Sequence, residues 1–503
     1  MPKSSTLILI APICALLFSM LLPVGCAAQQ SPAPADSQQG VVPAPEIAEF
    51  SMKTAAYFRS PDPEAQEEIG SPNENASQDQ RQRWSLHGQS TLIVQGYPGL
   101  QAAYTGPNSL PTGGQAKETL STDLYGGSRL WSGAEAHFDV LMWQGFGLDN
   151  TYGIEDYPNG EAYKAGTGTP RVNIARLFIR QAISLSGGRE QQFVPGDELT
   201  LAGKQDASQL TFTIGRFSPK DLFDNNAYAN DPRRQFMNWA LMANVAWDYP
   251  SDALGYTTGL GIELTQPKWS LRYGFFQIDH LRNAWTSEDQ FFTFPSYSGA
   301  GDGAFFKSWG MAAEYERRYS LNAHPAAIRF LAYLNQGRFG SYEAALSVPG
   351  ADISQTREYR HRYGFGLNWE QEITKSIGVF SRAGWNDGHN EAWMFTDINH
   401  SASLGISIKG DAWHRSDDTV GVAGVMSGIS RVNQEFLEAG GTGVLDGDGA
   451  LNYGWEKASE IYYDCKLSKN LHAALDYQFV ADPAFNRDRG SISIFATRLH
   501  WEF

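Results

Sequence analysis

The sequence predicts an all-β protein: a transmembrane antiparallel β-barrel of sixteen strands, with eighteen as the alternative count. Three observations predict it. An apolar segment of the export type stands at the N-terminus. From about residue 84 onward, apolar and polar residues alternate with a period of two, as in strands that have one face in lipid. The chain also ends in such an alternating segment, and its last residue is the aromatic Phe503.

The N-terminus predicts a secretory signal peptide over residues 1–28. Lys3 supplies the positive charge, residues 7–22 form the apolar stretch, and small residues lead up to cleavage near Ala28. An uncleaved anchor helix is one alternative, but the apolar run is short and interrupted by proline. A lipoprotein signal ending at Cys26 is the other alternative, and it leaves the lipidation of that cysteine open.

Residues 29–82 are rich in Pro, Ala, Gln, Ser and Glu. Such a composition cannot bury an apolar core. We therefore expect a periplasmic lead-in that is disordered or partly helical, followed by a barrel domain over residues 83–503.

The barrel strands are recognised by their alternation. A strand that spans lipid needs roughly 9–11 alternating residues. Segments 134–143, 363–370 and 471–480 have this pattern, and Leu475, for example, alternates with Asp476. A large soluble β-protein would also alternate. Frequent aromatic residues on the apolar faces and near the strand ends favour the membrane alternative, because such residues form girdles at the two interfaces.

The barrel must also be closed. An open sheet edge in hydrocarbon would leave backbone amides without partners, so the first and last strands are expected to pair. About 420 residues at roughly 23–27 per strand and connection give sixteen to eighteen strands, with long extracellular loops and short periplasmic turns. The last strand, 491–503, places Phe495, Leu499, Trp501 and Phe503 on one face. A terminal Phe resembles the signal that the outer-membrane assembly machinery reads.

Composition excludes several classes of protein. The mean hydropathy of −0.37 argues against a helical membrane protein. The net charge of −16 argues against nucleic-acid binding, which needs a basic surface. Cys14 and Cys26 lie in the predicted leader, so Cys465 is the lone remaining thiol, and disulfides and paired-cysteine metal sites are excluded. Cys465 is expected to face lipid.

Motifs for catalysis and metal binding are weak. The sequence has no Gly-x-Ser-x-Gly, phosphate-binding Gly-Lys-Ser/Thr or His-Glu-x-x-His motif. His389, Glu391 and His400 are interpreted as loop surface. Residues 446–449 (Asp-Gly-Asp-Gly) resemble the start of a calcium loop but lack its third acidic position and closing Glu, so a turn is preferred. We expect no catalytic residue, no cofactor and no metal site.

Several blocks of residues resemble the carbohydrate-selective porins (OprB type). The most specific are Gly215-Arg216-Phe217, Asp221 to Asn226, and Asn230 to Trp239. Further matching blocks are 126–135, 145–148, 158–162, 176–181 and 476–479, with Asp482-Pro483 and Phe503. The resemblance covers about residues 84–503.

The resemblance implies a location and a function. The chain would lie in the bacterial outer membrane, among its lipid and lipopolysaccharide, and let sugars (mono- and oligosaccharides) or other small hydrophilic solutes diffuse through. Relatives with the same motifs look like proteins assigned to manganese uptake, so a divalent metal ion (manganese) porin is the alternative. A second alternative is an outer-membrane barrel enzyme or an exopolysaccharide-export barrel. Monomer and homotrimer stay equally open.

Selectivity in a porin depends on the width of the pore and on the charges at its narrowest part. The alternation nominates inward residues, and the polar block 225–238 is expected to fold into the lumen or rim, where Asp221 and Asp224 would help to narrow the mouth. The alternatives are charges that pair only for stability and a structural plug that fixes the wall. Inward Trp143 and Phe178 are expected to offer surfaces to sugar rings. The predicted pore-lining residues are Glu135, Asp139, Arg176, Arg180, Arg216, Asp231, Arg233, Arg234, Glu263, Arg272, Arg382 and Asp476.

Overall fold

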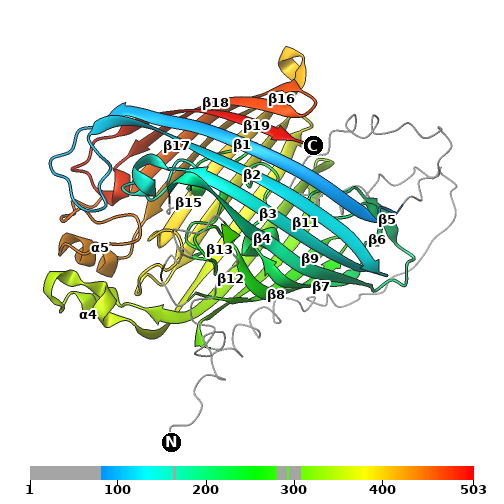
Figure 1. Cartoon of the computed structure of the whole chain (residues 1–503), viewed down its shortest axis with the longest axis horizontal. Helices are drawn as coiled ribbons and strands as arrows, with labels where there is room; N and C mark the ends of the chain where they lie inside the picture. Colours follow the sequence, from blue (N-terminus) through cyan, green and yellow to red (C-terminus); the bar gives the residue numbers. More distant parts are fainter. Residues whose placement is uncertain (1–80, 163–165, 280–281, 283–291, 294–306) are drawn as a thin grey trace, which may run out of the picture. The chain divides into compact units, whose positions relative to one another are not determined.

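The computed structural model describes residues 81–162, 166–279, 282, 292–293 and 307–503. Within them, sixteen long strands form one antiparallel sheet in which each strand pairs with its neighbours along the chain (Figure 1). These strands are β1 (Trp84–Gly99), β2 (Gly113–Trp131), β3 (Ala134–Gly145), β4 (Thr167–Ser184), β7 (Gln209–Phe217), β8 (Thr257–Gln266), β9 (Trp269–Gln277), β11 (Trp309–Leu321), β12 (His324–Phe339), β13 (Glu358–Thr374), β14 (Ile377–Asn386), β15 (His400–Gly410), β16 (Arg415–Gly428), β17 (Glu456–Ser468), β18 (Leu471–Ala481) and β19 (Ile492–Glu502). A two-residue strand, β10 (Phe292–Thr293), pairs in parallel with β4.

The sheet closes on itself because β1 pairs with β19 in antiparallel register, with Gln89 opposite Glu502. The backbone of Phe503 donates to Gly88 at 2.9 Å and accepts from it at 3.2 Å. The Phe503 ring lies so close to Gly88 that a Cβ there would overlap it. The predicted closed barrel of sixteen strands, rather than eighteen, is thus confirmed.

The strands have apolar residues outside and charged residues inside, the reverse of a water-soluble protein. Leu475 is 66 % exposed, whereas its neighbour Asp476 is 6 % exposed. On β15, Leu404 points outward and is 63 % exposed, and Arg329 of β12 is completely buried inside. The predicted alternation of 134–143, 363–370 and 471–480 is present in β3, β13 and β18.

The two ends of the barrel differ. Six connections at one end are short turns: 132–133, 267–268, 322–323, 375–376, 411–414 and 469–470. Connections at the other end are long and carry α4 (Tyr342–Ala345) and α5 (Arg431–Glu438), which Figure 1 shows opposite β5 (Gln191–Val194) and β6 (Gly203–Asp206). Short turns face the periplasm in bacterial barrels, so the long loops are extracellular. The connection 185–208 is the exception at the turn end, because it folds as the β5–β6 hairpin.

Within the ranges that the structure describes, the remaining helical elements are single turns in the connections. They are η2 (Leu148–Thr151), η3 (Pro219–Asp221), α2 (Trp239–Met242), η4 (Pro349–Ala351), η5 (Ile353–Thr356), η6 (Asp411–Trp413) and η7 (Pro483–Phe485). Among the described residues, no helix is both long and apolar enough to cross a membrane.

The connection between β7 and β8, residues 218–256, folds into the barrel, and we call it the inward segment. It contacts the inner face of strands on widely separated parts of the wall, including β2, β13 and β18. The packing is close: Gly366 and Gly384 face each other on β13 and β14, and a Cβ on either would overlap the Asn244 side chain.

The apolar core therefore lies inside the barrel and is built on the inward segment. Phe236 packs against Phe380 of β14 and Tyr462 of β17, with ring centroids 5.3 and 5.0 Å apart. Such a core holds the segment at a fixed position, because buried aromatic side chains contribute large contact areas.

The predicted signal peptide (1–28) and the predicted lead-in up to residue 80 lie outside the described residues and stay predictions. At the start of the described chain, the backbone N–H of Gln82 donates to Ala202 of the 185–208 connection at 3.0 Å. Cys465 lies on the outer face of β17, beside the exposed Ile461, and its sulfur accepts from Arg415 at 3.1 Å.

Candidate functional site

The start of the inward segment is fixed by local capping. The Ser218 side chain accepts a hydrogen bond from the Lys220 N–H, and the Asp221 carboxylate accepts one from the Ser218 N–H at 3.0 Å. The same carboxylate binds Arg176 of β4 through two nitrogens, at 2.7 and 2.8 Å. A bidentate pair of this kind sets orientation as well as position.

Asp224 is the main polar anchor of the segment. Its carboxylate accepts from Lys220 Nζ at 3.0 Å, from Arg382 Nε at 3.0 Å and from Asn368 Nδ2 at 2.7 Å. It also accepts from the backbone N–H of Asn244, at 2.8 Å. The lysine and the arginine are both buried, so each depends on this carboxylate for charge compensation.

A second group of contacts anchors the segment to the last strands. Glu460 of β17 accepts from the N–H groups of Met237 and Asn238, at 2.7 and 2.9 Å. Arg234 binds Glu502 of β19 at 2.8 Å, and Arg498 donates to two backbone carbonyls of the segment. The segment is thus tied to opposite sides of the wall.

Beside the inward segment lies a cavity of about 150 Å³, which we call the aromatic cavity. Tyr157 stacks on Trp239 with ring centroids 5.2 Å apart. Phe395 packs against Trp239 at 5.0 Å and against Tyr249 at 4.4 Å. Tyr157 and Phe395 come from the loops β3–β4 and β14–β15, so three different connections build this surface.

Charged groups stand next to these rings. Arg233 of the inward segment binds Asp123 of β2 and Glu161, each at 3.1 Å. Arg176 binds Asp139 at 2.6 Å, and its guanidinium lies over the Tyr256 ring at 5.0 Å. Each cation of this group is therefore paired with a carboxylate, and the cavity offers fixed donors and acceptors beside flat apolar faces.

Trp239 has an unusual feature within this cavity. Its side chain is buried, yet its indole N–H has no hydrogen-bond partner among the residues that the structure describes. A buried donor without an acceptor is costly, and because neighbouring side chains cover this N–H, a bound molecule or water reaches it only if they move.

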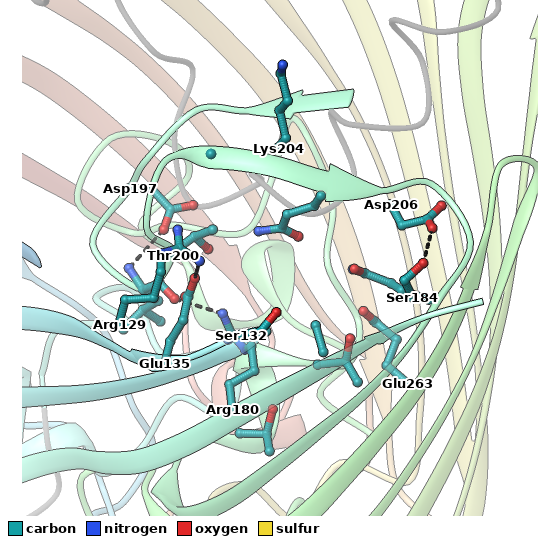
Figure 2. A pocket seen from close by; sticks show the side chains of 18 of the residues that line it. Arg129, Ser132, Glu135, Arg180, Ser184, Asp197, Thr200, Lys204, Asp206 and Glu263 are labelled. Atoms are coloured by element: carbon teal, nitrogen blue, oxygen red, sulfur yellow. Dashed lines mark hydrogen bonds and ion pairs between the residues drawn. The ribbon is translucent and has the colours of Figure 1, made fainter. Parts of the chain in front are cut away.

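A larger cavity, about 430 Å³, lies beneath the β5–β6 hairpin, and we call it the turn-end cavity. Figure 2 shows that charged side chains of the wall and of the hairpin surround it. Arg129 binds Glu135 at 2.9 Å, and Arg180 donates to the Leu199 carbonyl at 2.8 Å. Both cavities are lined by Leu199 and Asp221, so they adjoin each other along the lumen.

Two carboxylates of the hairpin connection have shifted pKa values. Burial, followed by the charge of Glu198, raises the pKa of Asp197 to about 7. Burial opposes ionisation of Asp206 as well, but hydrogen bonds from the hydroxyls of Ser184 and Ser186 outweigh it and lower the pKa of Asp206 to about 2. At neutral pH, Asp206 is thus a fixed anion at this mouth of the barrel.

The twelve predicted pore-lining residues all lie on the inner face of the wall or on the inward segment, but in different environments. Four line the turn-end cavity: Glu135, Arg180, Glu263 and Arg272. Three line the aromatic cavity: Arg176, Asp231 and Arg233. Asp139 and Arg216 form ion pairs with Arg176 and Asp252, which lie in or next to the lining of the aromatic cavity. Arg234 and Arg382 hold the inward segment to the wall, and Asp476 bonds to Gln478, which does the same.

Sequence reasoning missed most of the aromatic lining. Trp143 and Phe178 do point inward, but neither lines a cavity: Trp143 packs behind Leu254 of the aromatic cavity, and Phe178 packs against Phe217. The rings that line the aromatic cavity belong mainly to connections, which have no period that would reveal their direction. The one available signal was the proximity of Trp239 to the polar block 225–238.

Comparison with known proteins gives a consistent picture. A family model described as "Carbohydrate-selective porin, OprB family" matches residues 107–503. Among curated protein sequences, none matches this chain. The high-pH structure of Pseudomonas putida OprB has a TM-score of 0.63 at 14 % identity and covers 84 % of this chain and 94 % of its own.

Two further solved structures are more distant. The low-pH structure of Pseudomonas putida OprB has a TM-score of 0.44 at 11 % identity, covering 84 % of this chain and 93 % of its own. The outer-membrane channel DcaP of Acinetobacter baumannii has a TM-score of 0.43 at 8 % identity, covering 84 % and 97 %. At these identities, the first structure supports the fold alone. Since the family match spans most of the chain, this protein belongs to the carbohydrate-selective porin, OprB family and is a porin of the bacterial outer membrane.

Proposed function

We propose that this porin lets small carbohydrates diffuse passively across the outer membrane and that they contact the aromatic cavity on the way. The observation that carries the proposal is the cavity lining, in which the rings of Tyr157, Trp239 and Phe395 lie beside arginines paired with carboxylates. A sugar ring has apolar C–H faces that pack on an aromatic surface and hydroxyls that bond to such charged groups.

The charges of the cavity suit the same class of solute. Guanidinium groups present donors in a fixed fork, and Arg176 and Arg233 each hold theirs beside carboxylates. Neutral hydroxyl-rich molecules can bond to both partners of such a pair. A free divalent cation would instead need unpaired carboxylates, and those of Asp123, Asp139 and Asp221 each engage an arginine. The charge pairs of the aromatic cavity itself thus favour sugars over manganese as the solute.

Liposome swelling tests the proposal. Liposomes that contain the protein are expected to swell rapidly in monosaccharides and on the order of tenfold more slowly in trisaccharides, because the lumen is narrowed by the inward segment. The decisive arm uses MnCl₂, with manganese entry followed by the quenching of a fluorescent dye trapped in the liposomes. Rapid manganese entry without sugar entry would contradict the proposal and support the metal-ion porin.

Variants of Trp239 are the matched controls for this experiment. Loss of the ring in Trp239→Ala should weaken sugar binding in the pore, measured as block of ionic current, by roughly 2–10-fold, since an aromatic contact contributes about 0.5–1.5 kcal/mol. Trp239→Phe keeps a ring but removes the N–H, and its sugar affinity should lie between those of the wild type and Trp239→Ala. Equal sugar block in all three proteins would show that the cavity does not contact the solute.

A further inference from the structure

Three carboxylates from three extracellular loops meet inside the protein. Glu155 belongs to the β3–β4 loop, Asp397 to the β14–β15 loop and Asp446 to the β16–β17 loop. One carboxylate oxygen of each lies within 4.8 Å of the other two. Glu155 and Asp446 are completely buried, and Asp397 is 1 % exposed. In the described part of the chain, none of the three forms an ion pair with a lysine or arginine.

The oxygens at this meeting point lack donors. Among the described residues, neither carboxylate oxygen of Asp446 has a hydrogen-bond partner, and Glu155 Oε1 has none either. Asp397 is better satisfied, since it accepts from the Tyr342 hydroxyl at 2.9 Å and from the Val444 N–H. Burying a carboxylate without donors or a counter-ion costs several kcal/mol. The three carboxylates therefore lack the donors that a cluster held together by hydrogen bonds alone would need.

The cluster is also held in place by the backbone. The N–H of Asp397 donates to Glu155 Oε2 at 2.7 Å, and the N–H of Gly443 donates to the Asp446 carbonyl at 3.0 Å. Burial, reinforced by the neighbouring carboxylates, raises the pKa of Glu155 and Asp446 well above the usual range. The charge of Arg282 acts in the opposite direction on the pKa of Asp446, but the ion pair of this arginine is with Glu391, at 3.0 Å.

We propose that Glu155, Asp397 and Asp446 bind one Ca²⁺ ion that joins the three extracellular loops. Three oxygen ligands and no nitrogen or sulfur ligand select a hard cation. Ca²⁺ binds oxygen at about 2.3–2.6 Å, so two of its ligand atoms are at most about 5 Å apart, and one oxygen of each of the three carboxylates lies close enough to the other two to share such an ion. Mg²⁺ needs shorter and more regular coordination.

The site differs from the calcium loop that the sequence analysis rejected. Asp446 does open the Asp-Gly-Asp-Gly run, but its partner carboxylates lie about 290 and 50 residues earlier in the chain, at Glu155 and Asp397. Asp448, the other acidic residue of the run, bonds to Asn486 and Arg489 instead. A search for contiguous motifs cannot find a site whose ligands come from three separate loops. The sequence analysis used such motifs, which is why it predicted no metal site.

The position of the site gives the ion a role in the pore. Glu155 is two residues before Tyr157, and Asp397 is two residues after Phe395. Both aromatic side chains pack on Trp239 in the aromatic cavity. An ion that holds the two loops together would therefore keep these rings in place, whichever solute passes.

Calcium binding to the full chain tests the proposal. The protein is refolded in detergent without lipopolysaccharide, which itself binds Ca²⁺, treated with EDTA and titrated with CaCl₂ by calorimetry. One Ca²⁺ per chain is expected. Asp446→Asn should weaken the affinity at least tenfold, because a charged ligand is lost. Asp418→Asn is the matched control: it removes another buried carboxylate, at the turn end, and should keep the affinity within about twofold.

Thermal unfolding of the same proteins provides the second measurement. In EDTA, Asp446→Asn should be at least as stable as the wild type, because it relieves repulsion among buried carboxylates. In excess Ca²⁺ the order should reverse, since the ion stabilises only the chain that binds it. Absence of Ca²⁺ binding by the wild type, or equal binding by Asp446→Asn, would overturn the proposal.

Discussion

Replacing residues 219–255 with a short Gly-Ser linker is expected to raise the single-channel conductance roughly threefold or more, because this segment fills much of the lumen. The replacement is geometrically feasible, since Phe217 and Thr257, just outside it, are paired across β7 and β8. Discrimination between mono- and trisaccharides should be lost at the same time. Planar-bilayer recording and liposome swelling measure the two effects.

The control for this variant is a test of the barrel itself. Wall charges such as Arg382 lose their partners on the segment, but they then face water instead of a dry interior, so the barrel should still close. Heat-dependent mobility on a denaturing gel reports a folded barrel. A folded variant whose conductance stays within about twofold of the wild type would show that the segment is not what narrows the pore.

Asp224→Asn is expected to lower the free energy of unfolding by about 3–5 kcal/mol, the usual cost of leaving a buried charge without its partner. Lys220 and Arg382 both depend on this carboxylate, and its remaining contacts are hydrogen bonds to the segment and to β13. Urea unfolding of the protein in lipid, followed by tryptophan fluorescence, measures the change.

Asp417→Asn gives the matched control for this prediction. It removes the same charge from an exposed side chain whose ion pair is with Lys466, and it should change the free energy by about 0.5 kcal/mol or less. A loss below about 1 kcal/mol for Asp224→Asn would contradict the role of Asp224 as the main anchor.

The wall of the barrel was predictable because a lipid-facing strand imposes a strict period. Lipid requires Leu475 and Phe495 outside, and the period then places Asp476 inside without any knowledge of its partner. The terminal Phe503 indicated the closing strand because it continues the apolar face of an alternating segment at the end of the chain. Chain length and even parity limited the count to sixteen or eighteen strands, of which we preferred sixteen.

The interior was less predictable, since no period governs a loop. The polar composition of 225–238 indicated that it does not face lipid, but not that Asp224 would meet Arg382, 158 residues away in the sequence. For the same reason, Arg234 and Arg382 were predicted at the pore lining, whereas they anchor the segment. The β5–β6 hairpin and the meeting of Glu155 with Asp446 likewise depend on tertiary contacts alone.

Chemical modification of Ala253→Cys, in a chain that also carries Cys465→Ser, tests the solute pathway most directly. Ala253 lines the aromatic cavity, whereas Ala229 is completely buried next to Arg382 and serves as the control position. A charged methanethiosulfonate reagent should lower the current through the Ala253→Cys channel, and glucose should slow the reaction; the Ala229→Cys channel should not respond. A current through the Ala253→Cys channel that is insensitive to the reagent, or a reaction rate that glucose leaves unchanged, would contradict a route for sugars through this cavity.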